Sequence, residues 1–154
     1  MQPNGKEKVD RTLVRNQPYT QNQIKAIERH NERKNTNYTN CDVLLEHSPK
    51  NVYFKKCDKT YNQVFDNLLK NGQISTKGLK TDGTAHLMAE MMFDVNTDYF
   101  ERNGGYLYAR DFYAQAYELA KEIAGDEKYI LSAVMHADER NKPLSEEQGK
   151  DVFH

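Results

Sequence analysis

Tryptophan is absent from this chain of 154 residues, which also contains only two cysteines and four prolines. Cys41 and Cys57 form neither a CxxC pair nor the dense framework of a small disulfide-rich secreted domain. No segment approaches the roughly 18 consecutive apolar residues of a membrane span, and the polar start of the chain lacks the apolar core of a signal peptide. We therefore expect a cytoplasmic protein without a membrane partner.

Aromatic side chains, in contrast, are plentiful. Ten tyrosines and six phenylalanines make up 10% of the residues, although the mean hydropathy is −0.96. Chains that stay disordered are poor in aromatic residues, and a chain of this length can bury one hydrophobic core. The composition predicts a single domain over residues 1–154, with residues 1–10 disordered.

Charge is divided unequally between the two halves, although the whole chain carries a net charge of −1. Residues 1–80 contain 15 basic and 8 acidic side chains, a net charge of +7, and residues 81–154 contain 7 basic and 15 acidic ones, a net charge of −8. A polyanionic partner would therefore contact the first half. The alternative is that the two charged regions only solvate different faces of a globular domain.

Helices are predicted where capping residues precede an apolar period of 3.6. Thr20 with Gln23, and Thr60 with Gln63, are capping-box pairs that begin helices over 19–35 and 60–70. The third and clearest helix, over 106–124, has a predicted buried stripe of Tyr108, Phe112, Ala116, Leu119, Ala120 and Ile123.

Strands are predicted at 12–14, 85–95 and 128–135. We expect Pro18 and its neighbours to end the first of them, and we expect the last to be central in a sheet. Residues 35–51 are predicted to form an ordered loop, and Asn96 to begin a short helical turn. This order indicates an α+β fold with an antiparallel or mixed sheet and flanking helices.

The last predicted strand leads directly into His136-Ala137-Asp138-Glu139. Imidazole and carboxylate groups suit both divalent metal ions and acid–base chemistry, so this segment is a candidate site. The alternative is an ordinary polar turn after a core strand.

The first predicted helix carries His30 and Arg33, three residues apart, which predicts that both project from one face. Lys25, Arg29 and Arg33 follow at intervals of four, a row suited to a phosphate backbone. Glu28 and Glu32 lie between them, so an exposed helix laced with salt bridges is the alternative.

Together, the segments His30-Asn31-Glu32-Arg33 and His136-Ala137-Asp138-Glu139 resemble two motifs of the MobV relaxases, also called Mob/Pre plasmid recombination enzymes. That family has an early H-x-x-R and a later H-x-D-E followed by an H-x-H pair. Asp42-Val43 and the run from Ser48 to Phe54 also look like the family's intermediate segment. The resemblance extends from about Val14 to His154.

The resemblance implies an HUH-type fold, an antiparallel sheet with flanking helices, that nicks single-stranded DNA at an origin of transfer. On this basis His30 would be the nucleophile, and Arg33 would steady His30 or the phosphate. Glu139, or as second choice Asp138, would orient His30 or take its proton. A divalent metal, Mn or Mg, would be bound by His136 and His154. The expected DNA contacts are Lys25, Arg29, Lys34 and Asn51.

One departure from the family pattern is the absence of any H-x-H in this chain. We therefore expect a fold that is incomplete at its C-terminal end, with weak or no metal binding and no nicking by this fragment alone. An unpaired sheet edge would favour a homodimer. A non-catalytic DNA- or partner-binding remnant of a mobile element is the alternative. An HUH replication initiator ranks lower, because its catalytic tyrosine follows the H-x-H pair.

Overall fold

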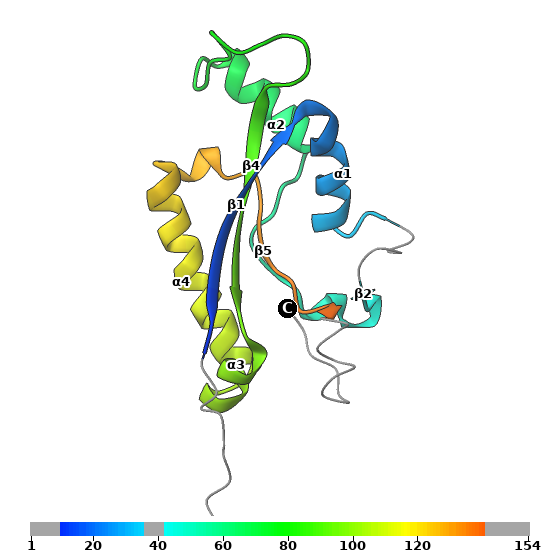
Figure 1. Ribbon diagram of the computed structural model, residues 1–154, viewed down its shortest axis with the longest axis vertical. Helices are drawn as coiled ribbons and strands as arrows, with labels where there is room; N and C mark the ends of the chain where they lie inside the picture. Colours follow the sequence, from blue (N-terminus) through cyan, green and yellow to red (C-terminus); the bar gives the residue numbers. More distant parts are fainter. Residues whose placement is uncertain (1–9, 36–41, 141–154) are drawn as a thin grey trace, which may run out of the picture.

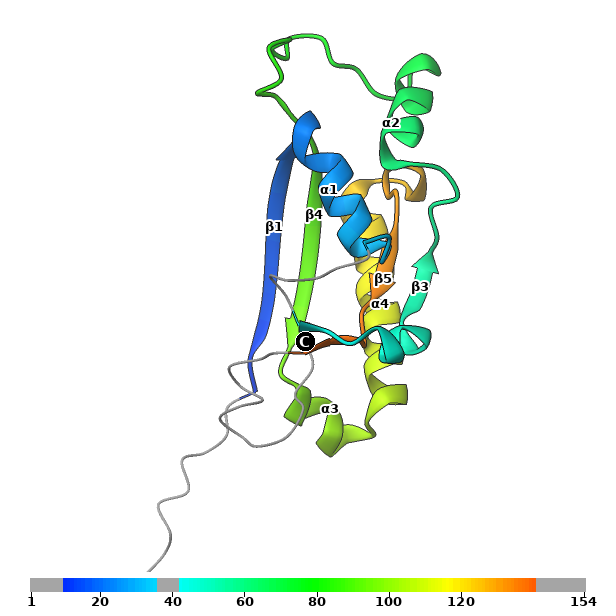
Figure 2. The same ribbon diagram turned by 90° about the vertical axis from the view of Figure 1, so that its right-hand side faces the viewer.

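The computed structural model describes residues 10–35 and 42–140. The disorder predicted for the start of the chain concerns, except for Asp10, residues outside these ranges, and so does the predicted metal ligand His154. The strands run between helix α4 (Tyr106–Ala124) on one side and helix α1 (Gln21–Asn31) on the other (Figures 1 and 2). The α+β class is therefore confirmed.

Every strand pair in the described ranges is antiparallel. Strand β1 (Thr12–Thr20) pairs along its whole length with β4 (His86–Val95). Strand β3 (Val52–Lys55) pairs with β5 (Ala133–Met135), and the short β2 (Asp42–Val43) pairs with β6 (Glu139–Arg140). The predicted antiparallel sheet is thus present as three two-stranded pieces.

The predicted helices are all present, with the capping residues expected of them. The Thr60 hydroxyl accepts from the Gln63 N–H, and the Gln63 side chain accepts from the Thr60 N–H, at the start of α2 (Tyr61–Lys70). Gly125 has a φ of 88° directly after α4, a left-handed conformation that glycine adopts without strain. The remaining elements are α3 (Thr97–Asn103) and two 3-10 turns, η1 (Leu45–Lys50) and η2 (Glu127–Tyr129).

Two strand predictions were wrong in their extent. Strand β1 continues through Pro18 to Thr20, because a proline without an N–H is tolerated in a strand at the edge of a sheet. The predicted strand over 128–135 shortens to β5, because the Asp126 carboxylate accepts from the Lys128 N–H and starts η2 instead. Within the described ranges β5 pairs with β3 alone, so it is not central there.

The buried face of α4 also differs from the predicted stripe. Ala109 and Ala116 are buried, whereas Leu119 and Ile123 are 55% and 67% exposed. The core consists of Val95 from β4, Phe100 from α3, Ala109 from α4 and Met135 from β5. None of the helices among the described residues is long and apolar enough to cross a bilayer.

Candidate functional site

Helix α1 ends at Asn31, and the chain then turns sharply at Arg33. Arg33 has a φ of 53°, in the left-handed region that non-glycine residues rarely occupy. This turn takes Arg33 out of the predicted basic row with Lys25 and Arg29 and directs its side chain inward, where it is only 7% exposed. The expectation that Arg33 continues an exposed row is therefore wrong.

The Arg33 guanidinium binds a fully buried carboxylate. Its Nε and Nη2 donate to the two oxygens of Asp138 at 2.8 and 2.7 Å, while its Nη1 donates to the backbone oxygen of His30 at 2.7 Å. Asp138 is 0% exposed. A bidentate pair fixes both partners in orientation as well as in distance, so the end of α1 is locked to the segment that follows β5.

Two residues of the predicted loop complete the surroundings of Asp138. Ser48 Oγ, in η1, donates to Asp138 Oδ2 at 2.7 Å, and the Asn51 side chain is bonded to the same carboxylate. Burial alone would raise the pKa of Asp138, but the hydrogen bonds from Arg33, Ser48 and Asn51 outweigh burial and hold that pKa well below its ordinary range. Asp138 is therefore a permanent anion at neutral pH.

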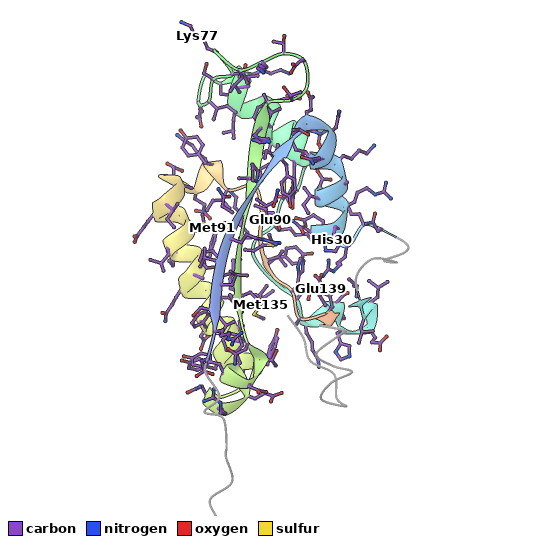
Figure 3. The ribbon with its side chains drawn as sticks, viewed as in Figure 1. His30, Lys77, Glu90, Met91, Met135 and Glu139 are labelled. Carbon is purple, nitrogen blue, oxygen red and sulfur yellow. The ribbon has the colours of Figure 1, made fainter. Side chains whose placement is uncertain are left out.

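Glu139 lies next to His30. Its Oε2 is 3.7 Å from His30 Nε2 and 3.3 Å from Arg33 Nη2, and the two side chains are 29% (His30) and 23% (Glu139) exposed. Figure 3 shows both side chains where α1 approaches β6. Contact with the His30 ring lowers the pKa of Glu139 to about 2, and the positive charge of Arg33 acts in the same direction. Partial burial acts the other way, but its effect is smaller. An ionised carboxylate thus faces an accessible imidazole.

His136 is attached to the end of the same helix. Its Nε2 lies 2.9 Å from the backbone oxygen of Asn31, and the Asn31 amide donates to Glu90 of β4 at 2.6 Å. Burial, together with the charge of Arg33, lowers the pKa of His136, so its ring is neutral at physiological pH. A neutral imidazole is the form that binds metal ions.

A complete metal site is not formed within residues 10–35 and 42–140. No group of three or more histidine, cysteine, aspartate or glutamate side chains there has the arrangement to hold an ion. Both oxygens of Asp138 are already bound by Arg33. Of the two predicted ligands, His136 is among the described residues and His154 lies outside them.

The expected DNA contacts divide into exposed and internal side chains. Lys25 and Arg29 are exposed on α1. Lys34 is 47% exposed, with its ammonium 3.0 Å from the buried carboxylate of Glu28. The Asn51 side chain is bonded inside the protein, because its Oδ1 accepts from the backbone N–H of Ala137 at 2.6 Å. The Asn51 amide nitrogen, the group that could donate to a phosphate, already donates to the Asp138 carboxylate.

The profile of the plasmid recombination enzyme family (Mob_Pre) matches residues 8–145. This chain belongs to the Mob/Pre family. Among solved structures, it is similar to the MobM relaxase domain (MOBV; Mob_Pre), crystallised with Mn and 22 nucleotides of plasmid pMV158 oriT DNA. The TM-score is 0.67 at 24% identity, over 83% of this chain and 64% of that one. No curated protein matches.

The Mob/Pre chain therefore spans less than two thirds of the length of the relaxase domain that it resembles. The likeness establishes the shared fold, with α1 and the β5–β6 turn brought together as the two histidine motifs implied. Sequence reasoning gave first place to Glu139 and did not anticipate that Asp138 anchors the site. Ser48, which donates to Asp138, lies in the segment from Ser48 to Phe54 that resembles the family's intermediate motif. That resemblance was the one sequence signal for this contact.

Proposed function

We propose that this chain is the N-terminal part of a relaxase that nicks one DNA strand through His30. The supporting observation is the meeting of His30, Glu139 and the Arg33–Asp138 pair at one partly accessible site built from two distant motifs. Catalytic side chains held by buried hydrogen-bonded partners are typical of preorganised active sites.

The proposed step is a displacement at phosphorus. A ring nitrogen of His30 attacks the scissile phosphate, an N–P bond forms, and the bond from phosphorus to the 3′ oxygen breaks. The 5′ phosphate stays covalently attached to His30, and the released 3′ oxygen takes a proton. Because the bond energy is retained in the phosphohistidine, the strand can be rejoined after transfer.

Glu139 fits the role of an orienting carboxylate. A proton on the ring nitrogen that faces Glu139 places the lone pair on the other nitrogen, and the carboxylate stabilises the positive charge that the ring gains on attack. Arg33 acts on this pair from inside the protein, through its contact with Glu139 and its bond to the backbone of His30, rather than on the phosphate.

A divalent metal, Mn or Mg, would belong to this function as a Lewis acid on a non-bridging phosphate oxygen. His136 would supply one ligand to it, and His154 remains the second ligand predicted from the sequence. The described residues do not complete such a site, so we expect divalent metal to bind this chain weakly.

Single-stranded DNA of a transfer origin is the proposed substrate, and Lys25, Arg29 and Lys34 are the proposed backbone contacts. Each lysine or arginine that neutralises a phosphate releases condensed counterion. We expect the affinity for an oligonucleotide to fall steeply with salt, and the slope of log K against log[salt] to lose about 0.7 for each of Lys25→Ala and Arg29→Ala. Affinity that does not depend on salt would contradict these contacts.

Covalent capture tests the nucleophile. The chain, extended to include the H-x-H pair of the family, is incubated with manganese and a labelled oligonucleotide that contains a Mob/Pre transfer origin, and the adduct is detected on a denaturing gel. We expect His30→Ala to abolish the adduct and to cost less than about 2 kcal/mol of stability, because a partly exposed side chain loses little packing. His86→Ala, at an exposed position of β4, is the matched control. An adduct that persists without His30 would place the nucleophile elsewhere.

A non-catalytic DNA- or partner-binding remnant is the second candidate, favoured by the incomplete metal site of the described residues. It predicts salt-dependent DNA binding with no adduct in any divalent metal. In either case we propose a cytoplasmic protein. The outer edge of β1, which has no neighbouring strand among the described residues, is the proposed contact of a homodimer, to be tested by light scattering.

A further inference from the structure

Two glutamates, one in α1 and one directly after it, bind a single tyrosine of α2. Glu28 is buried, and its Oε1 accepts from the backbone N–H of Tyr61 at 2.5 Å. Glu32, four residues further on, accepts from the Tyr61 hydroxyl at 2.6 Å. Like charges four residues apart destabilise an isolated helix. Their shared partner Tyr61 compensates for this repulsion. The sequence alone had suggested instead that both carboxylates belong to an exposed salt-bridged helix.

The same oxygen of Glu32 also reaches the segment that leads to His136. Ser132 Oγ donates to Glu32 Oε1 at 2.7 Å, and Ser132 directly precedes β5. Glu32 is the residue that follows α1, two positions after His30. One carboxylate oxygen therefore ties the helix end that carries His30 both to α2 and to the approach to β5.

These contacts are stiff for physical reasons. Hydrogen bonds from a hydroxyl to a carboxylate, at about 2.5–2.7 Å, are shorter and stronger than those between neutral groups. Tyr61 is only 7% exposed, so water competes little for its hydroxyl. The helix end is attached a second time through Arg33, which donates both to Asp138 and to the backbone oxygen of His30.

We propose that Glu32 is a positioning residue for His30. Through Tyr61 and Ser132 it fixes the end of α1 relative to β5, and with it the place of the His30 ring relative to Glu139 and His136. The catalytic consequence rests on the proposed function of His30, whereas the placement of the ring does not depend on it.

Four variants test the proposal against a matched control. Glu32→Ala removes the acceptor, and Glu32→Gln keeps an amide oxygen in its place. Tyr61→Phe and Ser132→Ala each remove one hydroxyl. Tyr117→Phe is the control, because the Tyr117 hydroxyl donates to Glu127 of η2 at 2.7 Å in the same kind of bond, without contact to Glu32.

Two measurements are made on each folded variant. Diethyl pyrocarbonate modifies neutral imidazole rings, so its rate at His30, measured by mass spectrometry without DNA or metal, reports on the surroundings of the ring, with His86 as internal reference. We expect this rate to rise about threefold in Glu32→Ala, as a locally held side chain gains freedom. In the chain extended to include the H-x-H pair, the rate of covalent adduct formation should fall on the order of tenfold with KM for the oligonucleotide unchanged, because misplacing a reacting group lowers kcat.

Glu32→Gln should restore both rates to within about threefold of wild type, because its oxygen still accepts from the two hydroxyls. Equal effects of Tyr61→Phe and Tyr117→Phe, or a Glu32→Gln protein as impaired as Glu32→Ala, would overturn the proposal. If the wild-type chain extended to include the H-x-H pair forms no adduct, the proposed function fails and the modification rates alone decide the role of Glu32. If Glu32→Ala does not fold, Tyr61→Phe and Ser132→Ala decide in its place.

Discussion

The two sides of the strands are held by different kinds of interaction. On the α4 side, aromatic rings of α3 and α4 pack around Phe100, with centroid distances of 5.5 Å to both Phe112 and Tyr113. On the α1 side, carboxylates and their donors dominate, with the Arg33–Asp138 pair fully enclosed. Figure 1 shows the two helices on opposite sides of the strands.

The difference shows that the α4 side contributes stability through apolar packing, whereas the α1 side fixes the positions of particular side chains. Apolar packing is non-directional, so the apolar residues of α4 do not by themselves fix which of its faces is buried, and Leu119 and Ile123 are exposed. Charged hydrogen bonds fix angles and distances, and an unpaired buried charge is costly. The α1 side therefore has few acceptable arrangements.

The largest effect is expected from Asp138→Ala. It leaves the Arg33 guanidinium buried without its partner, and breaking a buried pair in this way costs about 3–5 kcal/mol of unfolding free energy. Urea denaturation measures this loss, and adduct formation should be lost with it. Asp66→Ala, at an exposed position of α2, is the control and should stay within about 0.5 kcal/mol of wild type. A loss as small for Asp138 would mean that the pair does not hold the site.

Phe100→Ala tests the apolar packing on the α4 side of the strands. Truncating a phenylalanine that is 8% exposed in the core should cost about 3 kcal/mol. At a temperature where the variant is still folded, the diethyl pyrocarbonate reactivity of His30 should remain that of wild type, because the lost contacts are non-directional and lie on the α4 side. A changed His30 reactivity in folded Phe100→Ala protein would show that the two sides are not independent.

The sequence predicted the elements with strong local signals and missed those that depend on distant partners. The α4 boundaries agree with the prediction because Gly105 and Gly125 stop the helical pattern at both ends. Strand β3 was not predicted, because its four residues become a strand only through pairing with β5. The left-handed turn at Arg33 likewise depends on Asp138, 105 residues away in sequence.

The candidate site shows the same division. The two histidine motifs identified His30, His136 and Glu139, and the structure brings these residues to one place. The residues that hold them could not be assigned from spacing, because a buried carboxylate such as Glu28 reads in sequence as one more surface charge. Only the tertiary partners of Glu28, Glu32 and Asp138 distinguish them from exposed acids.

The smallest expected effect is a change in acid stability at Glu139. Its pKa is lowered in the folded protein to about 2, below the value of about 4.3 that glutamate has in an unfolded chain. The stabilisation is therefore fully present above about pH 4.3 and is lost as the pH falls toward 2, with a slope of at most about 1.4 kcal/mol per pH unit. Glu139→Gln lacks this titration.

Urea unfolding of wild type and Glu139→Gln at pH 7, 4 and 2, without divalent metal, measures the difference. We expect wild type to be the more stable protein at pH 7, and the difference between the two to shrink as the pH falls. Asp138 titrates in acid in both proteins, so comparing them isolates Glu139. Glu118→Gln is the matched control, because Glu118 pairs with Lys121 on the exposed surface of α4, where ion pairs contribute about 0–1 kcal/mol. A wild-type advantage that stays constant from pH 7 to pH 2 would mean that the contacts of Glu139 with His30 and Arg33 do not stabilise its charge, and that the carboxylate does not orient the ring.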